Sequence, residues 1–236
     1  RTCITVNGST VEDNVSQAPC YDTTVISGLD EPFNDLAGVM ILKGNLSSEG
    51  AVIKPSAATK SLLVHTGKAV VFEDIDDYKH RIDDPELDVD ENSILVLKNV
   101  GPKGYPGMPE VGNMGLPAKL LAKGVKDMVR ISDGRMSGTG FGTVVLHVAP
   151  ESADGGALGI VKDGDEITLD IHQRLLHLHL SDTEIADRLA AKAALPPITD
   201  RGYVQLYIKH VQGANLGADL DFLRGGSGSQ VTKDSH

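Results

Sequence analysis

The chain has 236 residues, of which 40% are hydrophobic and 23% charged, so it can bury an ordinary core and global disorder is excluded. Its formal net charge of −11 argues against nucleic acid as a partner, because phosphate binding relies on clustered Lys and Arg. No stretch reaches the roughly 18 apolar residues needed to span a membrane, and no signal peptide is visible.

The first hundred residues predict short strands separated by turns. Short β-branched runs bounded by Gly, Pro or Asn indicate strands with a buried face. These runs cover residues 39–42, 51–53, 69–72 and 94–97. Residues 74–82 predict a short helix, whose acidic first turn suits the helix dipole. Asn45-Leu46-Ser47 is a glycosylation sequon of a kind that is common by chance.

The second half alternates strands with a few helices. A helix is expected from Pro117 to Gly124, because Pro suits the first helical position and Gly the end. Strands are expected at 128–131, 143–148, 159–161 and 166–171, the last two joined by a tight turn. The capping box Ser181–Glu184 begins another helix, which Pro196 stops, and a further helix covers 201–212. Residues 225–236 are Gly/Ser-rich and predict a flexible tail. Many short strands with few helices predict an α+β class, mixed, β-barrel-like domain with flanking helices.

Two loops stand out as candidate sites, because each follows a predicted strand and could carry a side chain to the rim of a barrel. The first, Gly101–Glu110, holds three prolines and three glycines and ends in a carboxylate. The second, Ser132–Gly142, centres on Ser137 but lacks the Gly-x-Ser-x-Gly elbow, the dinucleotide fingerprint and the P-loop pattern. A glycine-rich turn without chemistry and a solvated Glu110 are the competing interpretations.

The same loops carry a family resemblance. Gly101–Glu110 resembles the GPKGxPGMPE segment, and Ser132–Gly138 the (S/T)DGRxSG segment, of the dihydroxyacid/phosphogluconate dehydratase family. Pro150–Asp165 resembles the family's PE…GG…V-x-DGD continuation, and Asn45–Lys54 its GNL-x-x-(D/E)GAV-x-K motif. Order and spacing match over nearly the whole chain. Residues 136–147 and 201–223 look more like the sugar-acid (aldonate) branch than the branched-chain branch.

The resemblance implies a particular domain organisation. Members of this family are two-domain enzymes, in which the N-terminal domain supplies the cysteines for an iron–sulfur cluster, of the 2Fe–2S kind, and most of the ligands of a magnesium ion. The C-terminal domain is a swivelling, β-barrel-like unit that closes the site. Residues 1–236 would be that C-terminal domain, with Arg1 near the end of the interdomain linker, and the isolated chain would be inactive. The lack of an initiator Met also suggests a chain cut from something longer.

Two cysteines, Cys3 and Cys20, match no cluster motif of the family and are too far apart for a zinc pattern. Two free thiols in a reducing compartment are expected, with a single disulfide as the alternative. The implied location is the cytoplasm, or the mitochondrion for a eukaryotic branched-chain enzyme. The implied partners are a small sugar acid, the protein's own N-terminal domain, and further copies in a homodimer or homotetramer.

The implied reaction is a hydro-lyase step that removes water from a 2,3-dihydroxy acid and gives a 2-keto-3-deoxy acid. By resemblance, an iron of the cluster binds the C3 hydroxyl as a Lewis acid, and magnesium holds the carboxylate. Glu110 matches a magnesium ligand, Ser137 matches the base, acting as an alkoxide, and Thr139 could donate a hydrogen bond to its oxygen. Two other functions stay open: a branched-chain dihydroxyacid dehydratase and an inactive stand-alone binding domain.

Overall fold

The computed structural model describes residues 1–28, 30–33, 38–138 and 140–225, and the chain divides into two compact units, 1–37 and 38–236. The first unit holds one short helix, α1 (Val11–Val15), capped by Thr10 and Asp13, which bond reciprocally. Cys3 and Cys20 are exposed and free, in agreement with the expectation of free thiols. Except for Gly225, the predicted flexible tail lies outside the described residues.

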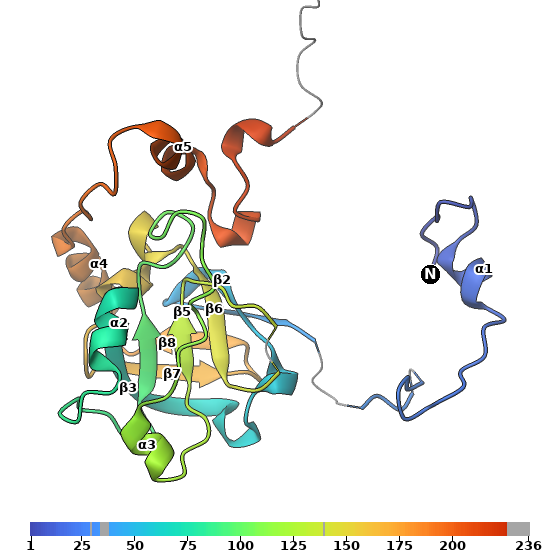
Figure 1. Cartoon of the computed structure of the whole chain (residues 1–236), viewed down its shortest axis with the longest axis horizontal. Coiled ribbons are helices and arrows are strands. Elements are labelled where there is room, and N and C mark those ends of the chain that lie inside the picture. The colour runs from blue at the N-terminus through green and yellow to red at the C-terminus, as the bar shows by residue number, and fades with distance from the viewer. Residues whose placement is uncertain (29, 34–37, 139, 226–236) are drawn as a thin grey trace, which may run out of the picture. The chain divides into compact units, whose positions relative to one another are not determined.

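The second unit is built around a closed barrel in the order β1-β2-β6-β5-β4-β3-β7-β8 (Figure 1). The strands are β1 (Met40–Gly44), β2 (Ser47–Ile53), β3 (Val64–Phe72), β4 (Ile94–Leu97), β5 (Arg130–Ser132), β6 (Val144–Ala149), β7 (Glu166–Asp170) and β8 (Leu175–Leu178). This closed mixed barrel confirms the predicted fold class.

Strands β3, β4, β5 and β6 are neighbours and run parallel, whereas β1–β2, β2–β6, β3–β7 and β7–β8 pair antiparallel. All four residues of β4 are buried, as is typical of a parallel strand covered on both faces. Since parallel strands end on the same side, the segments that follow β3 to β6 all leave the barrel at one end.

The barrel closes between β1 and β8. Lys43 faces Leu175 in a parallel register, and the Lys43 N–H donates to the Arg174 carbonyl at 2.8 Å. The side-chain amide of Asn45 then makes the two hydrogen bonds that a paired strand residue would make with its backbone. Its Nδ2 donates to the Leu178 carbonyl at 2.7 Å, and its Oδ1 accepts from the Leu178 N–H at 2.7 Å. The side-chain amide of Asn45, the asparagine of the sequon, is therefore engaged in closing the barrel.

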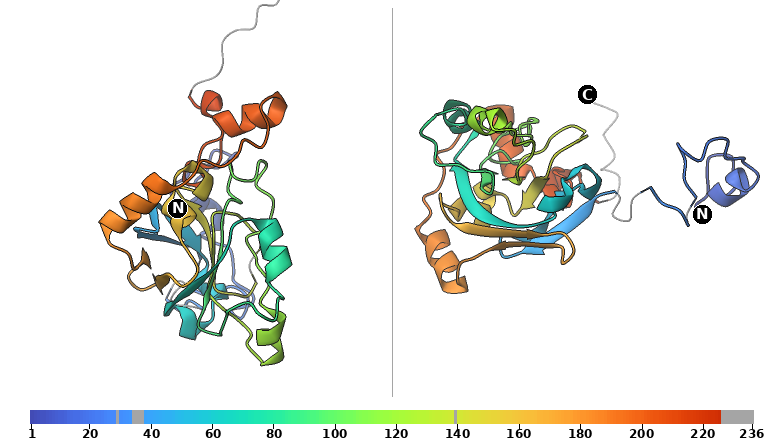
Figure 2. Two further views of the ribbon diagram at one scale, coloured as in Figure 1. Left: turned by 90° about the vertical axis from the view of Figure 1, so that its left-hand side faces the viewer. Right: turned by 90° about the horizontal axis from the view of Figure 1, so that it is seen from below.

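Helices cover the outside of the barrel. A buried cluster joins one face of β3 and β4 to α2 (Ile75–Arg81) and α3 (Ala118–Ala122) through Phe72, Leu97, Ile82 and Leu120, among others. Helix α4 (Asp182–Ala191) lies on a different side, which the two views of Figure 2 make clear, and α5 (Gly202–His210) follows it. Within the described ranges, no helix is long and apolar enough to cross a membrane.

The strand predicted at 159–161 is wrong. Residues Ala157–Ile160 form a 3₁₀ turn instead, in which the Gly159 N–H donates to the Gly156 carbonyl at 3.0 Å. Leu158, Ile160 and Val161 are buried, so tertiary packing rather than strand pairing explains the apolar run. Helix α4 begins as predicted, because the Ser181 side chain accepts a hydrogen bond from the Glu184 N–H. The Glu184 carboxylate, in contrast, binds Arg188 at 2.7 Å.

Candidate active site

The two loops that the sequence singles out follow neighbouring parallel strands. The loop with Glu110 follows β4, and the loop with Ser137 follows β5, which is paired in register with β4 from Leu95–Arg130 to Leu97–Ser132. Both loops therefore leave the same end of the barrel side by side. The topology alone places the predicted magnesium ligand and the predicted base on one rim.

Arg135 joins these two loops. Its Nη1 donates to Glu110 Oε1 at 2.7 Å, and its Nε donates to the Met108 carbonyl. Its own carbonyl accepts from the Gly112 N–H at 2.8 Å. One residue thus holds the Glu110 loop from both its side chain and its backbone, and it stands two positions before Ser137.

Glu110 and Ser137 are both exposed, as groups that must meet a substrate should be. The Glu110 side chain is 41% exposed even though Arg135 binds one of its oxygens. Ser137 lies in the exposed stretch that continues to Gly138, which has a φ of +33°. Thr139, the third predicted site residue, lies outside the described residues. The structure thus brings the loops of Glu110 and Ser137 together, while their chemical roles stay predictions.

A buried carboxylate forms the inner support of the first loop. Glu151, only 3% exposed, accepts hydrogen bonds from the Lys103 N–H at 2.9 Å and from the Gly104 N–H at 3.0 Å. A side chain on Gly101 would collide with the Glu151 carboxylate, so glycine is required for this approach. Burial raises the pKa of Glu151 to about 7, although the two N–H donors oppose the rise.

Asp133 connects the start of the second loop to the first. It is fully buried, and its carboxylate accepts from the Val100 N–H at 3.0 Å and the Ser152 N–H at 2.8 Å. Burial raises the pKa of Asp133 against the pull of these donors. Three segments, after β4, β5 and β6, are therefore tied to a single carboxyl group.

The second loop is held at its far end by a buried ion pair. Arg130 Nη2 donates to Asp127 Oδ1 at 2.9 Å, and Arg130 Nη1 donates to the Met114 carbonyl at 2.8 Å. Burial acts to raise the pKa of Asp127, but hydrogen bonds from Thr59 and Thr143 and the Arg130 charge outweigh it and lower that pKa. The pair therefore bonds the segments that follow both loops, at Met114 after the first and at Thr143 after the second.

Helix α5 approaches the rim at Tyr207, whose phenol lies near the backbone of Gly107 in the first loop. Burial raises the pKa of this phenol. Sequence reasoning gave no role to Tyr207, Arg135, Asp133 or Glu151. The last three do lie inside the quoted motifs, which is a signal that they matter, but nothing in a motif says which groups they contact.

The described residues contain no group of three His, Cys, Asp or Glu side chains that could bind a metal ion. Glu110 offers an exposed carboxylate, the ligand type that Mg²⁺ prefers, and so fits a contributor to a site completed by other groups. Cys3 and Cys20, the two cysteines of the chain, lie in the first compact unit and do not form a cluster-binding set.

Comparisons with known proteins agree with the loop motifs. Residues 24–218 match the family model described as the dihydroxy-acid/6-phosphogluconate dehydratase C-terminal domain. The chain is 57% identical to L-arabinonate dehydratase of Rhizobium leguminosarum bv. trifolii, over 99% of the chain and 40% of that protein. It is 56% identical to L-arabonate dehydratase of Azospirillum brasilense, over 99% of the chain and 41% of that protein.

A dihydroxy-acid dehydratase of Acetivibrio thermocellus is 39% identical, over 92% of the chain and 39% of that protein. The chain thus spans about two fifths of the length of these relatives. The higher identity to proteins that act on sugar acids agrees with the branch that residues 136–147 and 201–223 indicate.

Proposed function

Because the chain belongs to the dihydroxy-acid/6-phosphogluconate dehydratase family and matches its C-terminal domain, we propose that it is the part of a sugar-acid dehydratase that brings Glu110 and Ser137 to the substrate. The observation that carries this proposal is the Arg135 bridge, which fixes the Glu110 loop beside the Ser137 loop. An L-arabinonate-like aldonate is the substrate class, since the more similar relatives act on it.

In the proposed reaction, Ser137 Oγ, as an alkoxide, takes the proton from C2 of the 2,3-dihydroxy acid. The electrons of the broken C–H bond form a C2–C3 double bond, and the C3–O bond breaks to release hydroxide. The hydroxide takes the proton from Ser137 and leaves as water, which restores the alkoxide. The enol gives up the proton of its C2 hydroxyl, takes up a proton at C3 and becomes the 2-keto-3-deoxy acid. Bound metal ions supply Lewis acidity toward the substrate's oxygens.

The loop around Ser137 suits a reactive oxygen. A free serine is too weak an acid to ionise near neutral pH, so its alkoxide needs nearby positive charge and hydrogen-bond donors. Arg135 brings a guanidinium into the same loop, and the left-handed backbone at Gly138 lets main-chain N–H groups approach closely. Glu110 would contribute one carboxylate to a magnesium site, and an iron–sulfur cluster would be held by an N-terminal domain.

The first test replaces the base. Ser137→Ala in the intact protein should reduce kcat on L-arabinonate by about 10²–10⁴-fold and change KM little, because proton abstraction is lost while binding remains. Steady-state kinetics on L-arabinonate and on 2,3-dihydroxyisovalerate measures this and separates the sugar-acid from the branched-chain function. Ser61→Ala, at an exposed serine in a 3₁₀ turn, is the matched control and should have full activity. Undiminished turnover by Ser137→Ala would remove Ser137 from the mechanism.

A second test concerns magnesium. Glu110→Gln should raise, by about tenfold or more, the Mg²⁺ concentration at which the thermal stabilisation of the intact protein is half-maximal. The reason is that a neutral amide is a poorer Mg²⁺ ligand than a carboxylate. A thermal-shift titration with Mg²⁺ provides this value without relying on turnover. Glu86→Gln, another exposed loop residue, should behave as wild type. Identical Mg²⁺ protection in Glu110→Gln and wild type would contradict the assignment of Glu110.

A further inference from the structure

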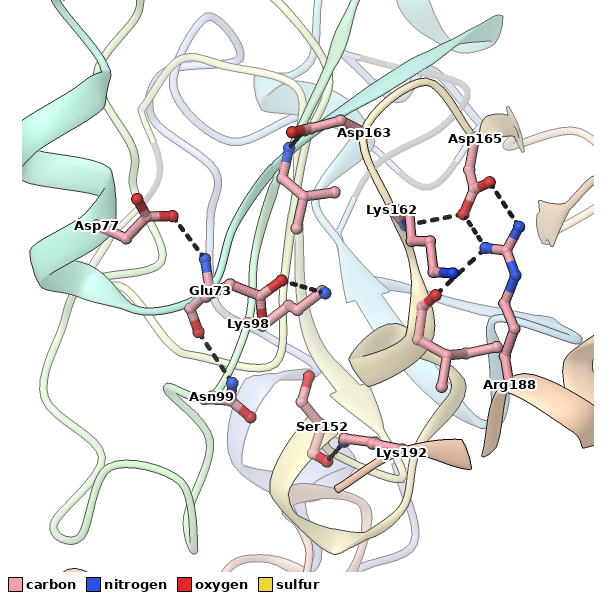
Figure 3. A network of polar contacts seen from close by, with 12 residues as sticks. Glu73, Asp77, Lys98, Asn99, Ser152, Lys162, Asp163, Asp165, Arg188 and Lys192 are labelled. Carbon is pink, nitrogen blue, oxygen red and sulfur yellow. Dashed lines mark hydrogen bonds and ion pairs between the residues drawn. The ribbon is translucent and has the colours of Figure 1, made fainter. Parts of the chain in front are cut away.

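A pocket of about 720 Å³ is lined by residues from the ends of β3 and β4, the 159–163 segment and helix α4. Figure 3 shows Lys98, Lys162 and Lys192, which line this pocket from three different segments; the Lys98 side chain ends at Glu73 and the Lys192 side chain at Ser152. None of these lysines belongs to the candidate active site. The pocket therefore needs an explanation of its own.

Lys98 is an unusual lysine because it is only 3% exposed. Its ammonium donates to Glu73 Oε1 at 2.7 Å, while the Glu73 side chain is 65% exposed. This is the one hydrogen bond of the Lys98 ammonium among the described residues, and an ammonium has three donors. Lys98 thus has donor capacity to spare inside the pocket.

Lys192, directly after α4, points into the same pocket. Its Nζ donates to the Ser152 carbonyl, and within the described part of the chain no carboxylate lies within ion-pair distance of it. A side chain on Gly159 would collide with Lys192 Nζ, so the glycine makes room for this amine. Burial, and then the positive charge of Lys98, lower the pKa of Lys192. Lys98 and Lys192 therefore bring two positively charged groups to the lining of one pocket.

We propose that this pocket binds a small oxyanion, carrying a phosphate or carboxylate group, between the ammonium groups of Lys98 and Lys192. Charge-assisted hydrogen bonds to both amines would relieve their repulsion. The apolar walls at Val71, Ile160 and Val161 lower the local dielectric and strengthen that attraction. Glu73 competes for Lys98, so the affinity is expected to be modest, on the order of millimolar.

Two of the other charged residues that line the pocket are already engaged, whereas the side chains of Lys162 and Asp187 form no ion pair among the described residues. Arg188 binds Asp165 and Glu184, and Asp163 accepts from the Val71 N–H at 2.6 Å. The pocket nevertheless connects to the active-site rim. Lys192 donates to the Ser152 carbonyl, and the Ser152 N–H donates to Asp133, which lies at the start of the Ser137 loop. This site is additional to the proposed dehydratase function and does not depend on it.

The experiment titrates the intact protein with orthophosphate and, separately, with acetate, at an ionic strength held constant with potassium chloride. Calorimetry and the shift of the melting temperature should show saturable binding of at least one of the two, and their comparison identifies the preferred group. Lys192→Met should weaken binding by about tenfold or more, since a charge-assisted hydrogen bond is lost. Glu73→Gln should strengthen it severalfold, because the competing carboxylate is removed.

Two controls locate the effect. Lys126→Met, at an exposed lysine outside the pocket, and Glu110→Gln, in the candidate active site, should both leave oxyanion binding unchanged. If Lys192→Met does not fold, Lys192→Gln takes its place. Absence of saturable binding, equal binding by wild type and the Lys192 variant, weaker binding by Glu73→Gln, or loss of binding in Glu110→Gln would each overturn the proposal.

Discussion

Glu151 is a buried carboxyl group that changes its charge near neutral pH. Its folded-state pKa of about 7 lies above the ordinary value of 4.5, so the folded protein binds this proton more tightly than the unfolded chain. The associated stability is fully present below pH 4.5 and is lost as pH rises to 7, by an amount on the order of 3 kcal/mol.

Glu151→Gln should remove this pH dependence, because an amide does not titrate. The unfolding free energy of wild type minus that of Glu151→Gln should fall between pH 5 and pH 7 and be constant above that range. Urea unfolding of the intact protein at several pH values provides this difference. A difference that does not vary with pH would show that Glu151 titrates alike in both states.

At this scale, the sequence predicts which residues matter better than what they contact. Glu110 and Ser137 follow from the loop motifs. The ion pair between Arg135 and Glu110 spans 25 residues and exists only because β4 and β5 are parallel neighbours, which no local pattern specifies. In the sequence, Glu151 likewise looks like an ordinary acidic residue. Only the fold brings the N–H groups of Lys103 and Gly104 to its carboxylate.

At the scale of elements, the Asp127–Arg130 pair connects the segments that follow the two loops, at Met114 and Thr143. The side chains are 3% and 8% exposed, so removing one partner leaves an uncompensated charge in the interior. Arg130→Met should lower the unfolding free energy by about 3–5 kcal/mol. The exposed pair Lys79–Asp76 offers the control, since Lys79→Met should change stability by less than about 0.5 kcal/mol.

Denaturant unfolding of both variants checks this prediction. A cost for Arg130→Met as small as that for Lys79→Met would mean that Asp127 relaxes into solvent or takes up a proton. The Thr59 and Thr143 hydroxyls bond Asp127 at 2.7 Å each, and they hold it in place against that relaxation.

Most elements could be predicted because their signals are local. The helix at 75–81 begins at Asp74, whose carboxylate accepts the N–H groups of Asp76 and Asp77, and acidic first turns are visible in sequence. The 157–160 turn could not be predicted, since a short buried apolar run reads alike for a strand and for a packed turn. The barrel order is also partly nonlocal: β2 pairs with β6, and β3 pairs with β7, although neither pair is consecutive in the sequence.

At the scale of the whole molecule, barrel closure depends on the side chain of Asn45. Asn45→Ala removes both of its bonds to the Leu178 backbone and should cost roughly 1–3 kcal/mol of stability, because the Leu178 N–H loses its Asn45 acceptor and the Leu178 carbonyl keeps the Leu180 N–H but loses the Asn45 donor. Hydrogen exchange of the Leu178 amide should become faster. Asn92→Ala, at an exposed loop residue, is the control and should leave that amide protected. Unchanged protection in Asn45→Ala would show that β8 is held without Asn45.

The way the barrel closes has a mechanical consequence. β3 and β7 share register pairs from Val64–Asp170 to Lys68–Glu166, whereas β1 and β8 share Lys43–Leu175 and the Asn45 bonds. When the molecule is pulled, rupture should start where β1 meets β8, and the barrel should then unroll as a sheet. The rim with Glu110 and Ser137 belongs to β4 and β5, well inside that sheet order, so it should keep its shape until late in forced unfolding.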